Sequence, residues 1–420
     1  MRSIVASWLL LAPASVAAFH HIQLRNPPKI RGIRMVSAAS PAQDTATKLQ
    51  SELAAIRGLR PTDQSADVQR SLWKAAGLIP AFKVSGLYTG EASFTMLFSH
   101  ETWTKYTGTS PFFRWWRTFV TWPYSTVLAS VWPICVAASA WAFCVASLPA
   151  RLLPRTSPIP ITLIGSAIGL LLVFRVNNLY GRVAEARLLW GRAVFLTRQA
   201  AQTVATSLLF ESLPAEQQPS AHEAAAQVCR YLAAFPWELN SKLTGKGDGV
   251  GKTRDLRPGE STEILEALLS PAEAAWIGQA RSRPLQLLGA MRRVLHGQLQ
   301  AGSLHPMVYR KIDEDLKELD LVVGGCERLF SSPVPPTMSR HAIRSIMLWL
   351  IGLPFGIAGS MAPLFVALWT FALSYIFVGI EEVGAQVEQP FEITPMTRLC
   401  NVIMFNLEEA FSVPPAEDAP

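Results

Sequence analysis

Beyond the N-terminal 40 residues, three stretches of the chain carry no charged residue and are each about as long as a membrane-crossing helix or longer. They are Thr118–Ala150, the residues between Arg155 and Arg175, and Ser345–Ile380. A helix needs about 20 apolar residues to cross the roughly 30 Å hydrocarbon core of a bilayer. We therefore expect membrane elements at about 118–150, 156–176 and 345–380.

Prolines and glycines modify two of these elements. Pro123 and Pro133 lie inside the first and predict kinks, which a bilayer helix tolerates when its neighbours satisfy the freed backbone groups. The third stretch would be about 54 Å long as one straight helix, nearly twice the core, and it contains Pro354, Gly359 and Pro363. It is therefore expected to form two elements or a bent one.

The second apolar stretch has a charged continuation. Beyond Arg175, the apolar residues Val183, Ala186, Leu189 and Ala193 recur at helical spacing. This pattern predicts that one helix leaves the bilayer and runs on for several turns in water. No uncharged run long enough to cross a membrane follows before the third stretch, so residues 177–344 are interpreted as water-exposed helices.

Composition supports a membrane protein and argues against other classes. Of 420 residues, 50% are hydrophobic and 16% are charged, whereas soluble proteins have about 25% charged residues. The net charge of +7 is scattered without a nucleic-acid-binding motif, so no nucleic acid partner is expected. The five cysteines show no metal-ligand spacing, and no catalytic constellation is visible. We expect no metal, no cofactor and no enzymatic activity.

The N-terminal residues have the layout of targeting segments. Residues 1–18 combine Arg2, an apolar run and small residues, as a signal peptide does, and residues 19–40 begin with Phe19 and are basic without acidic residues. Together they resemble the two-part presequence of algae with secondary plastids. The alternative is a secretory signal followed by a basic linker.

Two further regions have no legible function. Residues 41–112 form an N-terminal region in which the pattern is compatible with an amphipathic helix around Lys48 to Ile56. Residues 393–420 are interpreted as a C-terminal tail, and residues 113–392 as the main domain.

Three segments carry a resemblance to a known family. Residues 174–191 read FRVNNLYGRVAEARLLWG, residues 324–335 read GGCERLFSSPVP, and residues 379–391 read GIEEVGAQVEQPF. In this order, they resemble the signatures of the bestrophin family in its bacterial and plastid branch. The matching motif residues, to which we assign structural roles, are Arg182, Glu185, Arg187, Glu327, Arg328, Pro390 and Phe391.

The resemblance implies a fold and a pore. Bestrophins are all-α integral membrane bundles in which five identical subunits surround a central pore and the helix matching residues 161–192 lines a narrow apolar neck. By this resemblance, Ser166, Leu170 and Phe174 line the neck, and Leu353 falls near a second constriction on the cytosolic side. From helical spacing alone, packing between helices is the better interpretation of the Ser166, Leu170 and Phe174 stripe.

Polar residues beyond the neck have competing interpretations. Arg175 either attracts and selects anions or is an interfacial arginine that extends toward water. Asn177 either offers amide donors to an anion or caps backbone groups. Arg182, Glu185 and Arg187 are best interpreted as a structural ion-pair network.

The function implied is passive conduction of chloride or bicarbonate across a plastid membrane, the thylakoid, with the plasma membrane or another endomembrane as the alternative. The expected partners are the anion, membrane lipid and four further copies of the chain. Animal bestrophins bind calcium through an acidic run after their Pro-Phe, whereas here Phe391 is followed by Glu392-Ile-Thr-Pro395, which argues against calcium gating. The rival function is a non-conducting membrane scaffold or photosystem-associated subunit with the same fold.

Overall fold

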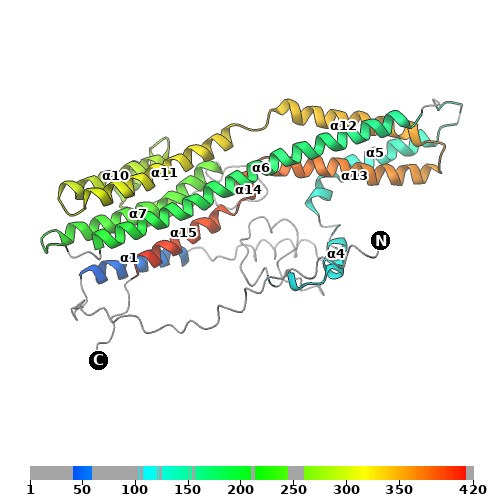
Figure 1. Ribbon diagram of the computed structural model, residues 1–420. Helices are drawn as coiled ribbons and strands as arrows, with labels where there is room; N and C mark the ends of the chain where they lie inside the picture. Colours follow the sequence, from blue (N-terminus) through cyan, green and yellow to red (C-terminus); the bar gives the residue numbers. More distant parts are fainter. Residues whose placement is uncertain are drawn as a thin grey trace, which may run out of the picture. The chain divides into compact units, whose positions relative to one another are not determined.

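The computed structural model describes residues 41–58, 104, 107–120, 122, 125–149, 151–153, 157–209, 213–244 and 260–412. The predicted targeting segments at 1–40 lie outside these residues, as does Pro123. Within the described residues the fold is all-α, as predicted (Figure 1). Its helices are α1 (Pro41–Gly58), α4 (Pro111–Val120), α5 (Thr126–Ala146), α6 (Ile159–Val204), a π-helical turn (Ala205–Leu209), α7 (Gln218–Leu243), α8 (Glu260–Leu268), α9 (Pro271–Gly278), α10 (Arg283–Gln300), α11 (Pro306–Ser331), α12 (Pro336–Ile357), α13 (Pro363–Val387), α14 (Pro390–Ile393) and α15 (Met396–Ala410).

Helix α6 connects two separate cores. It has 46 residues, which at 1.5 Å per residue is about 69 Å, roughly twice the thickness of the hydrocarbon core. Its first half packs in an apolar cluster with α12 and α13, and its second half packs in a larger core with α7, α11 and α15 (Figure 1). The prediction that the second membrane helix continues far beyond Arg175 is confirmed.

The membrane half contains α5, the first half of α6, α12 and α13. Among the described residues, three segments are long and apolar enough to cross a membrane: Val127–Ala146, Ile159–Leu209 and Pro363–Val387. Helices α5 and α13 run antiparallel, because the start of α5 at Val127 lies beside Gly379 and the Ser139 hydroxyl near its end donates to the Ala367 carbonyl oxygen at 2.9 Å. The chain is therefore a membrane protein with a multi-helix apolar bundle.

Two predicted membrane elements have different boundaries in the structure. The first begins at Ser125, whose hydroxyl accepts a hydrogen bond from the Leu128 amide and caps α5, so α4 is a separate helix. The third is two helices, α12 and α13, as its length suggested. They are joined at Gly359, whose φ of 84° favours glycine because a Cβ atom would be strained there.

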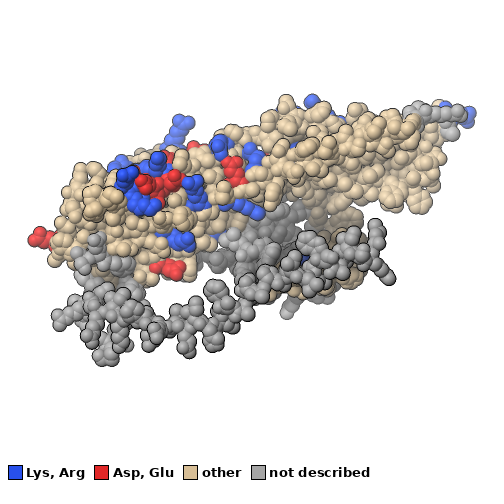
Figure 2. Space-filling view, in the orientation of Figure 1, with Lys and Arg blue, Asp and Glu red and all other residues tan. Residues whose placement is uncertain are grey.

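The water-exposed half is built around α7. Nearly every residue of α7 from Ala221 to Leu243 is buried. The largest fully buried side chains include Phe235 of α7 and Trp190 of α6. Figure 2 shows charged side chains gathered over this half, while the visible surface over α5, α12 and α13 is almost uncharged except at its far end. This division agrees with the interpretation of residues 177–344 as water-exposed helices.

Helices from the two ends of the described chain complete this core. Ala46, Leu49, Leu53 and Ile56 recur at helical spacing on α1 and are all buried against it. On α15, the buried residues are Met396, Thr397, Cys400, Asn401, Ile403, Met404 and Leu407. The expectation of a separate tail at 393–420 is therefore corrected: up to residue 412 this segment belongs to the core, because α15 presents an apolar face at helical spacing.

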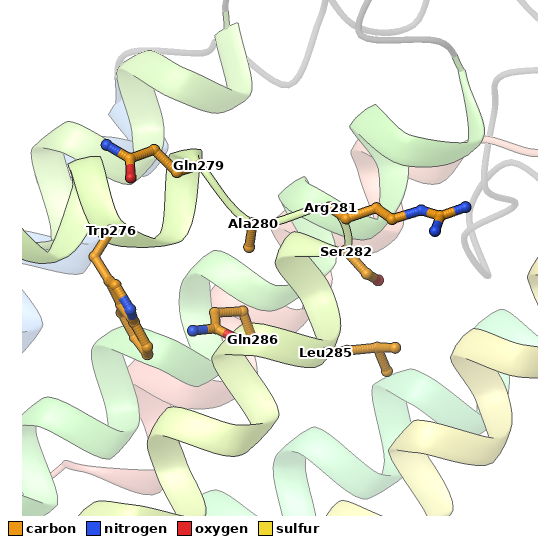
Figure 3. A pocket seen from close by; sticks show the side chains of 7 residues that line it. All are labelled: Trp276, Gln279, Ala280, Arg281, Ser282, Leu285 and Gln286. Carbon is orange, nitrogen blue, oxygen red and sulfur yellow. The ribbon is translucent and has the colours of Figure 1, made fainter.

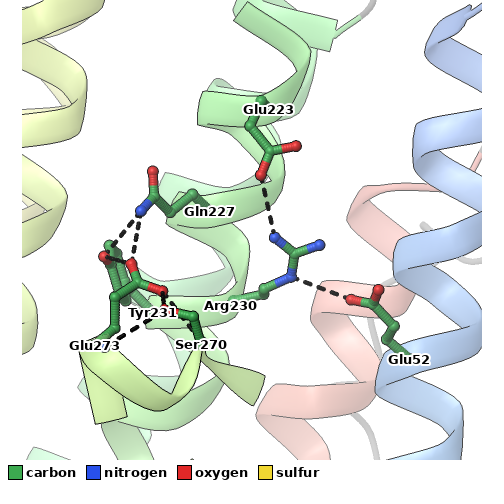
Figure 4. A network of polar contacts seen from close by, with 7 residues as sticks. All are labelled: Glu52, Glu223, Gln227, Arg230, Tyr231, Ser270 and Glu273. Carbon is green, nitrogen blue, oxygen red and sulfur yellow. Dashed lines mark hydrogen bonds and ion pairs between the residues drawn. The ribbon is translucent and has the colours of Figure 1, made fainter. Parts of the chain in front are cut away.

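Ionic contacts attach α1 to α7. The Arg230 guanidinium of α7 donates to the Glu52 carboxylate of α1 at 3.1 Å and lies 3.5 Å from Glu223 (Figure 4). The Gln50 side-chain amide of α1 also donates to the Glu408 carbonyl oxygen of α15 at 3.1 Å. Polar contacts thus accompany the apolar packing that holds α1 and α15 in this core.

A second polar network joins α7 to the start of α9. Ser270 and Glu273 form a capping box at the N-terminus of α9, and Glu273 also accepts hydrogen bonds from the Tyr231 hydroxyl at 2.5 Å and the Gln227 amide at 2.8 Å (Figure 4). Burial acts to raise the pKa of Glu273, but the hydrogen bonds from Tyr231, Ser270 and Gln227 outweigh it and lower that pKa. Burial and the bond to Glu273 raise the pKa of Tyr231. The charged Glu273 therefore fixes α9 against α7.

Replacing a buried residue of α15 tests whether this helix is part of the core. Leu407 is fully buried, so we expect Leu407→Ala to lower the free energy of unfolding by about 2–5 kcal/mol, because it leaves a cavity in a packed site. The measurement is the thermal unfolding midpoint of the purified protein in detergent. Glu409→Ala, on an exposed position of the same helix, is the matched control and should change little. Equal midpoints for both variants would mean that α15 is a loosely attached tail.

Candidate functional site

One face of α6 is left uncovered by the rest of the subunit. Ser166, Leu170, Phe174 and Asn177 are all exposed and follow one another at spacings of four, four and three residues, so they share one stripe of the helix. Leu170 is 58% exposed and Phe174 is 60% exposed, although both are large and apolar. The structure thus brings the three predicted neck residues together on a free apolar surface, and Asn177 follows at the end of that surface.

The opposite face of α6 is packed tightly inside the subunit. Ile168 and Leu172 are buried in the membrane cluster with Trp349 and Leu350 of α12. A Cβ atom on Gly165 would lie only 3.2 Å from the Trp349 ring, and the Trp349 indole N–H donates to the Ile161 carbonyl oxygen at 2.8 Å. This packing fixes the rotation of α6 and therefore the direction in which the exposed stripe faces.

The hydroxyl of Ser166 is already engaged within α6. It donates to the Leu163 carbonyl oxygen at 2.8 Å. Its proton therefore points back along the helix, and only oxygen lone pairs remain for any molecule that contacts the stripe. Ser166 therefore adds no hydrogen-bond donor to the exposed stripe.

Arg175 is directed away from the stripe. Its side chain is 5% exposed, forms an ion pair with Glu381 of α13, and has its Nη2 atom 4.0 Å from Oε2 of Glu388. One residue corresponds to a rotation of about 100° around a helix, so Arg175 faces α13 although Phe174 is exposed. This corrects the expectation for Arg175: within the subunit it neither meets solvent as an anion-attracting group nor extends to the interface, and it is neutralised by carboxylates.

Leu353 also differs from its predicted role. Its side chain is 4% exposed and belongs to the buried cluster that includes Ile168, Leu172 and Trp349. Lining a second constriction requires an exposed position, so the assignment of Leu353 is corrected. The sequence places Leu353 on an apolar helix, but this helix is apolar on both its packed and its exposed faces.

The first and second motif segments meet where α6 crosses α11. Arg182 donates from its two terminal nitrogens to the carbonyl oxygens of Leu329 and Ser332, both at 2.7 Å, at the C-terminal end of α11. Glu185 forms an ion pair with Arg328. Arg182 and Glu185 therefore both contact α11, Arg182 through backbone carbonyl oxygens and Glu185 through an ion pair, and these contacts differ from the ion-pair network expected along α6.

Two of the remaining motif residues, Glu327 and Phe391, also pack or pair between helices. Glu327 forms an ion pair with Lys242 of α7. Gly325 lies against α6 so closely that a Cβ atom there would be 2.9 Å from a methyl carbon of Leu189. Pro390 begins α14, and Phe391 beside it is 2% exposed in the core of the water-exposed half. Arg187 is exposed on α6.

Cys326, in the middle of the second segment, is buried and chemically quiet. Burial raises the pKa of its thiol to about 12, so the thiolate needed for nucleophilic attack or metal binding is absent at neutral pH. Among the residues that the structure describes, no group of three or more histidine, cysteine, aspartate or glutamate side chains is placed to hold a metal ion.

A pocket that sequence reasoning missed lies between α9 and α10. It has a volume of about 500 Å³ and is lined by Trp276, Gln279, Ala280, Arg281, Ser282, Leu285 and Gln286. Trp276 and Gln286 face each other across it (Figure 3). Ser282, one of the lining residues, accepts a hydrogen bond from the Lys242 ammonium at 2.7 Å. Short polar stretches between helices gave no signal for it in the sequence.

Comparisons with known proteins agree with the motif pattern. The sequence pattern of a family described as Bacterial/Fungal Bestrophin protein matches residues 106–409. A voltage-dependent anion channel-forming protein of Ralstonia nicotianae is 28% identical over 307 residues, which are 71% of this chain and 92% of that protein. Voltage-dependent chloride channel 1, chloroplastic, of Arabidopsis thaliana is 28% identical over 258 residues, 61% of this chain and 57% of that protein.

Solved structures give the same result for the fold. A bacterial bestrophin homolog from Klebsiella pneumoniae has a TM-score of 0.57 and 27% sequence identity, and the match covers 66% of this chain and 96% of that chain. The matched share of the bacterial protein is nearly its whole length. The fold described above is therefore shared with this bacterial protein over the matched residues.

The buried pair of Arg175 and Glu381 can be tested by stability. Arg175→Met leaves a mostly buried carboxylate without its cation, and we expect it to lower the free energy of unfolding by about 3–5 kcal/mol. Combining it with Glu381→Gln should restore part of this loss, and Asn177→Ala, on the exposed face, should change stability little. The measurement is thermal unfolding in detergent. Unchanged stability of Arg175→Met together with a reduced anion current would instead support the anion-attracting role.

Proposed function

The chain belongs to the bestrophin family, and from this premise we propose that it is a channel through which chloride or bicarbonate flows passively across a membrane. The observation that carries the proposal is the exposed stripe of Leu170 and Phe174 on α6, whose opposite face is locked inside the subunit. Five copies of the chain arranged around one axis would turn this stripe into the wall of a pore.

The neck of the proposed pore is formed by Ser166, Leu170 and Phe174. Rings of bulky apolar side chains make a narrow passage that water leaves easily, and such constrictions can gate ion flow. Leu170 and Phe174 supply the bulky side chains. Ser166 has a smaller and more polar side chain, so the neck is wider and less apolar at its position. The neck therefore sets the conductance and affects the choice of ion.

Attraction of anions falls to groups beyond the neck. Arg175 is neutralised by Glu381, so the nearest exposed polar group on the stripe is Asn177, whose amide N–H groups can donate to an anion. Further along α6, the exposed Arg187 adds positive charge, and the chain as a whole carries a net charge of +7. A vestibule lined by positive charge raises the local concentration of anions before they enter.

The membrane that holds the channel is proposed to be a plastid membrane, and more specifically the thylakoid. Support comes from the layout of residues 1–40 and from the similarity to an Arabidopsis protein named as chloroplastic. The membrane half and the water-exposed half fit any bilayer equally well, so the address depends on the N-terminal segments.

Substitutions in the neck test the channel and its wall together. With the purified protein in planar bilayers under a salt gradient, we expect a reversal potential near the anion equilibrium value, with chloride and with bicarbonate. Leu170→Ala and Phe174→Ala should raise single-channel conductance several-fold, because they widen the narrowest apolar ring. Leu171→Ala, at the same depth but packed toward the membrane cluster, is the matched control and should leave conductance unchanged.

The same recording separates the rival function. Absence of current from a well-formed pentamer would favour the non-conducting scaffold. Current that Leu170→Ala and Phe174→Ala leave unchanged would keep the channel but place its neck on other residues.

The plastid address can be tested with the N-terminal segments alone. Residues 1–40 fused to a fluorescent protein and expressed in an alga with a secondary plastid should direct the fusion into the plastid. A fusion with residues 1–18 alone is the control and should be secreted. Secretion of both fusions would support a plain secretory signal, and fractionation of plastid membranes would decide whether the full chain resides in the thylakoid.

A further inference from the structure

Helix α4 has two chemically opposite faces. At about 100° per residue, Phe112, Trp115, Trp116 and Phe119 gather on one side, and Arg114 and Thr118 lie on the other. Phe112 is 78% exposed, Trp115 81% and Phe119 63%, so the aromatic face has no cover within the described part of the subunit. A surface this apolar requires an occupant other than water.

The position of α4 in the chain places it beside the membrane bundle. It ends a few residues before α5, whose first turn at Val127 lies next to Gly379 of α13. Gly379 is close in sequence to Glu381, which pairs with Arg175 where α6 leaves its apolar half. The chain therefore passes from α4 into the bilayer on the same side as the water-exposed helices.

A row of aromatic rings links α4 to α13. The Trp122 indole N–H donates to the Tyr375 hydroxyl at 2.8 Å, and the two rings meet edge to face with centroids 5.4 Å apart. Centroids of Trp122 and Phe119, and of Phe119 and Trp116, are each 6.3 Å apart. Trp and Tyr concentrate where membrane and water meet, so this row marks the level of the bilayer surface.

We propose that α4 lies in the surface of the bilayer on the side of the water-exposed helices and binds the anionic headgroups of that leaflet. Its aromatic face enters the acyl region, as the apolar faces of interfacial helices do. Its sequence contains Arg114 and Arg117 and no acidic residue, which complements phosphate or sulfonate groups. The inference requires membrane insertion only, and it holds whether or not the protein conducts anions.

A lipid surface fits α4 better than a protein partner does. The aromatic face adjoins a membrane-crossing helix, and the opposite face carries Arg114 and Thr118, with Phe113 at the edge between the two faces. An interfacial position satisfies both faces of one short helix at once. A second copy of the chain, or residues 59–103 of the same subunit, would satisfy the aromatic face alone.

The test uses spin labels on the full protein in lipid nanodiscs. Cys144, the exposed one of the five free cysteines, is first replaced by serine. Labels are then placed by Trp115→Cys on the aromatic face and by Thr118→Cys on the polar face. We expect the first label to collide with oxygen but not with a water-soluble nickel chelate, and the second label to show the reverse.

Three outcomes would overturn the proposal. Exposure of both labels to the nickel chelate would place α4 in water. Shielding of the Trp115→Cys label from both reagents would show that protein covers the aromatic face, either a second copy or residues 59–103. A shielded Thr118→Cys label with an exposed Trp115→Cys label would reverse the orientation.

The anionic part of the proposal has its own measurement. Nanodiscs of phosphatidylcholine with added phosphatidylglycerol should protect the Trp115→Cys label more than phosphatidylcholine alone. The substitutions Arg114→Gln and Arg117→Gln each remove one positive charge, and each should reduce the additional protection given by phosphatidylglycerol by about fivefold. Arg310→Gln removes the same charge from an exposed site of α11 and should change nothing. Equal protection in both lipid mixtures would remove the anionic headgroups from the proposal.

Discussion

The continuity of α6 is the constraint on which the other elements depend. Backbone groups inside a bilayer must be bonded internally, so the first half of α6 has to be helical. Nothing in the sequence of its second half interrupts the helix before the π-helical turn at Ala205. One continuous helix therefore spans both the bilayer and water, and each of the two cores packs on its own half of α6.

The three motif segments are held in mutual contact by α6. Arg175 binds the segment at the end of α13, while Arg182 and Glu185 bind the segment at the end of α11. All of these contacts lie within the stretch where α6 passes from apolar to charged surroundings. The motif residues thus meet at one junction, which fixes the orientation of the membrane core relative to the water-exposed core. The exposed stripe of Leu170 and Phe174 belongs to the same helix, α6.

Much of this arrangement could be predicted from the sequence, for identifiable reasons. Uncharged length determines where helices can cross a bilayer, and the spacing of Val183, Ala186 and later residues determines that α6 continues. Helical spacing likewise predicted that Ser166, Leu170 and Phe174 share a stripe, although it could not tell whether that stripe was covered. The amphipathic helix around Lys48 to Ile56 was visible in the same way.

The misplaced residues share one cause, which is that a sequence shows the faces of a helix but not its neighbours. Arg175 was assigned by its nearness to Phe174, yet a single residue turns it toward α13 and Glu381. Leu353 lies on a helix that is apolar on several faces, so nothing in its pattern distinguished a packed face from a free one. The third motif segment ends at Phe391 and no motif follows it, so the sequence alone favours a tail there, although residues 396–410 form a helix with a buried face.

The inward hydrogen bond of Ser166 has a consequence for how an ion would travel. In the proposed channel, the neck offers an anion two rings of hydrocarbon and one ring of oxygen lone pairs, and none of these can replace the water molecules bound to the ion. The cost of passage would therefore follow the hydration energy of each anion rather than its charge. A large anion with a weakly bound hydration shell would therefore cross more easily than a small anion of the same charge with a tightly bound one.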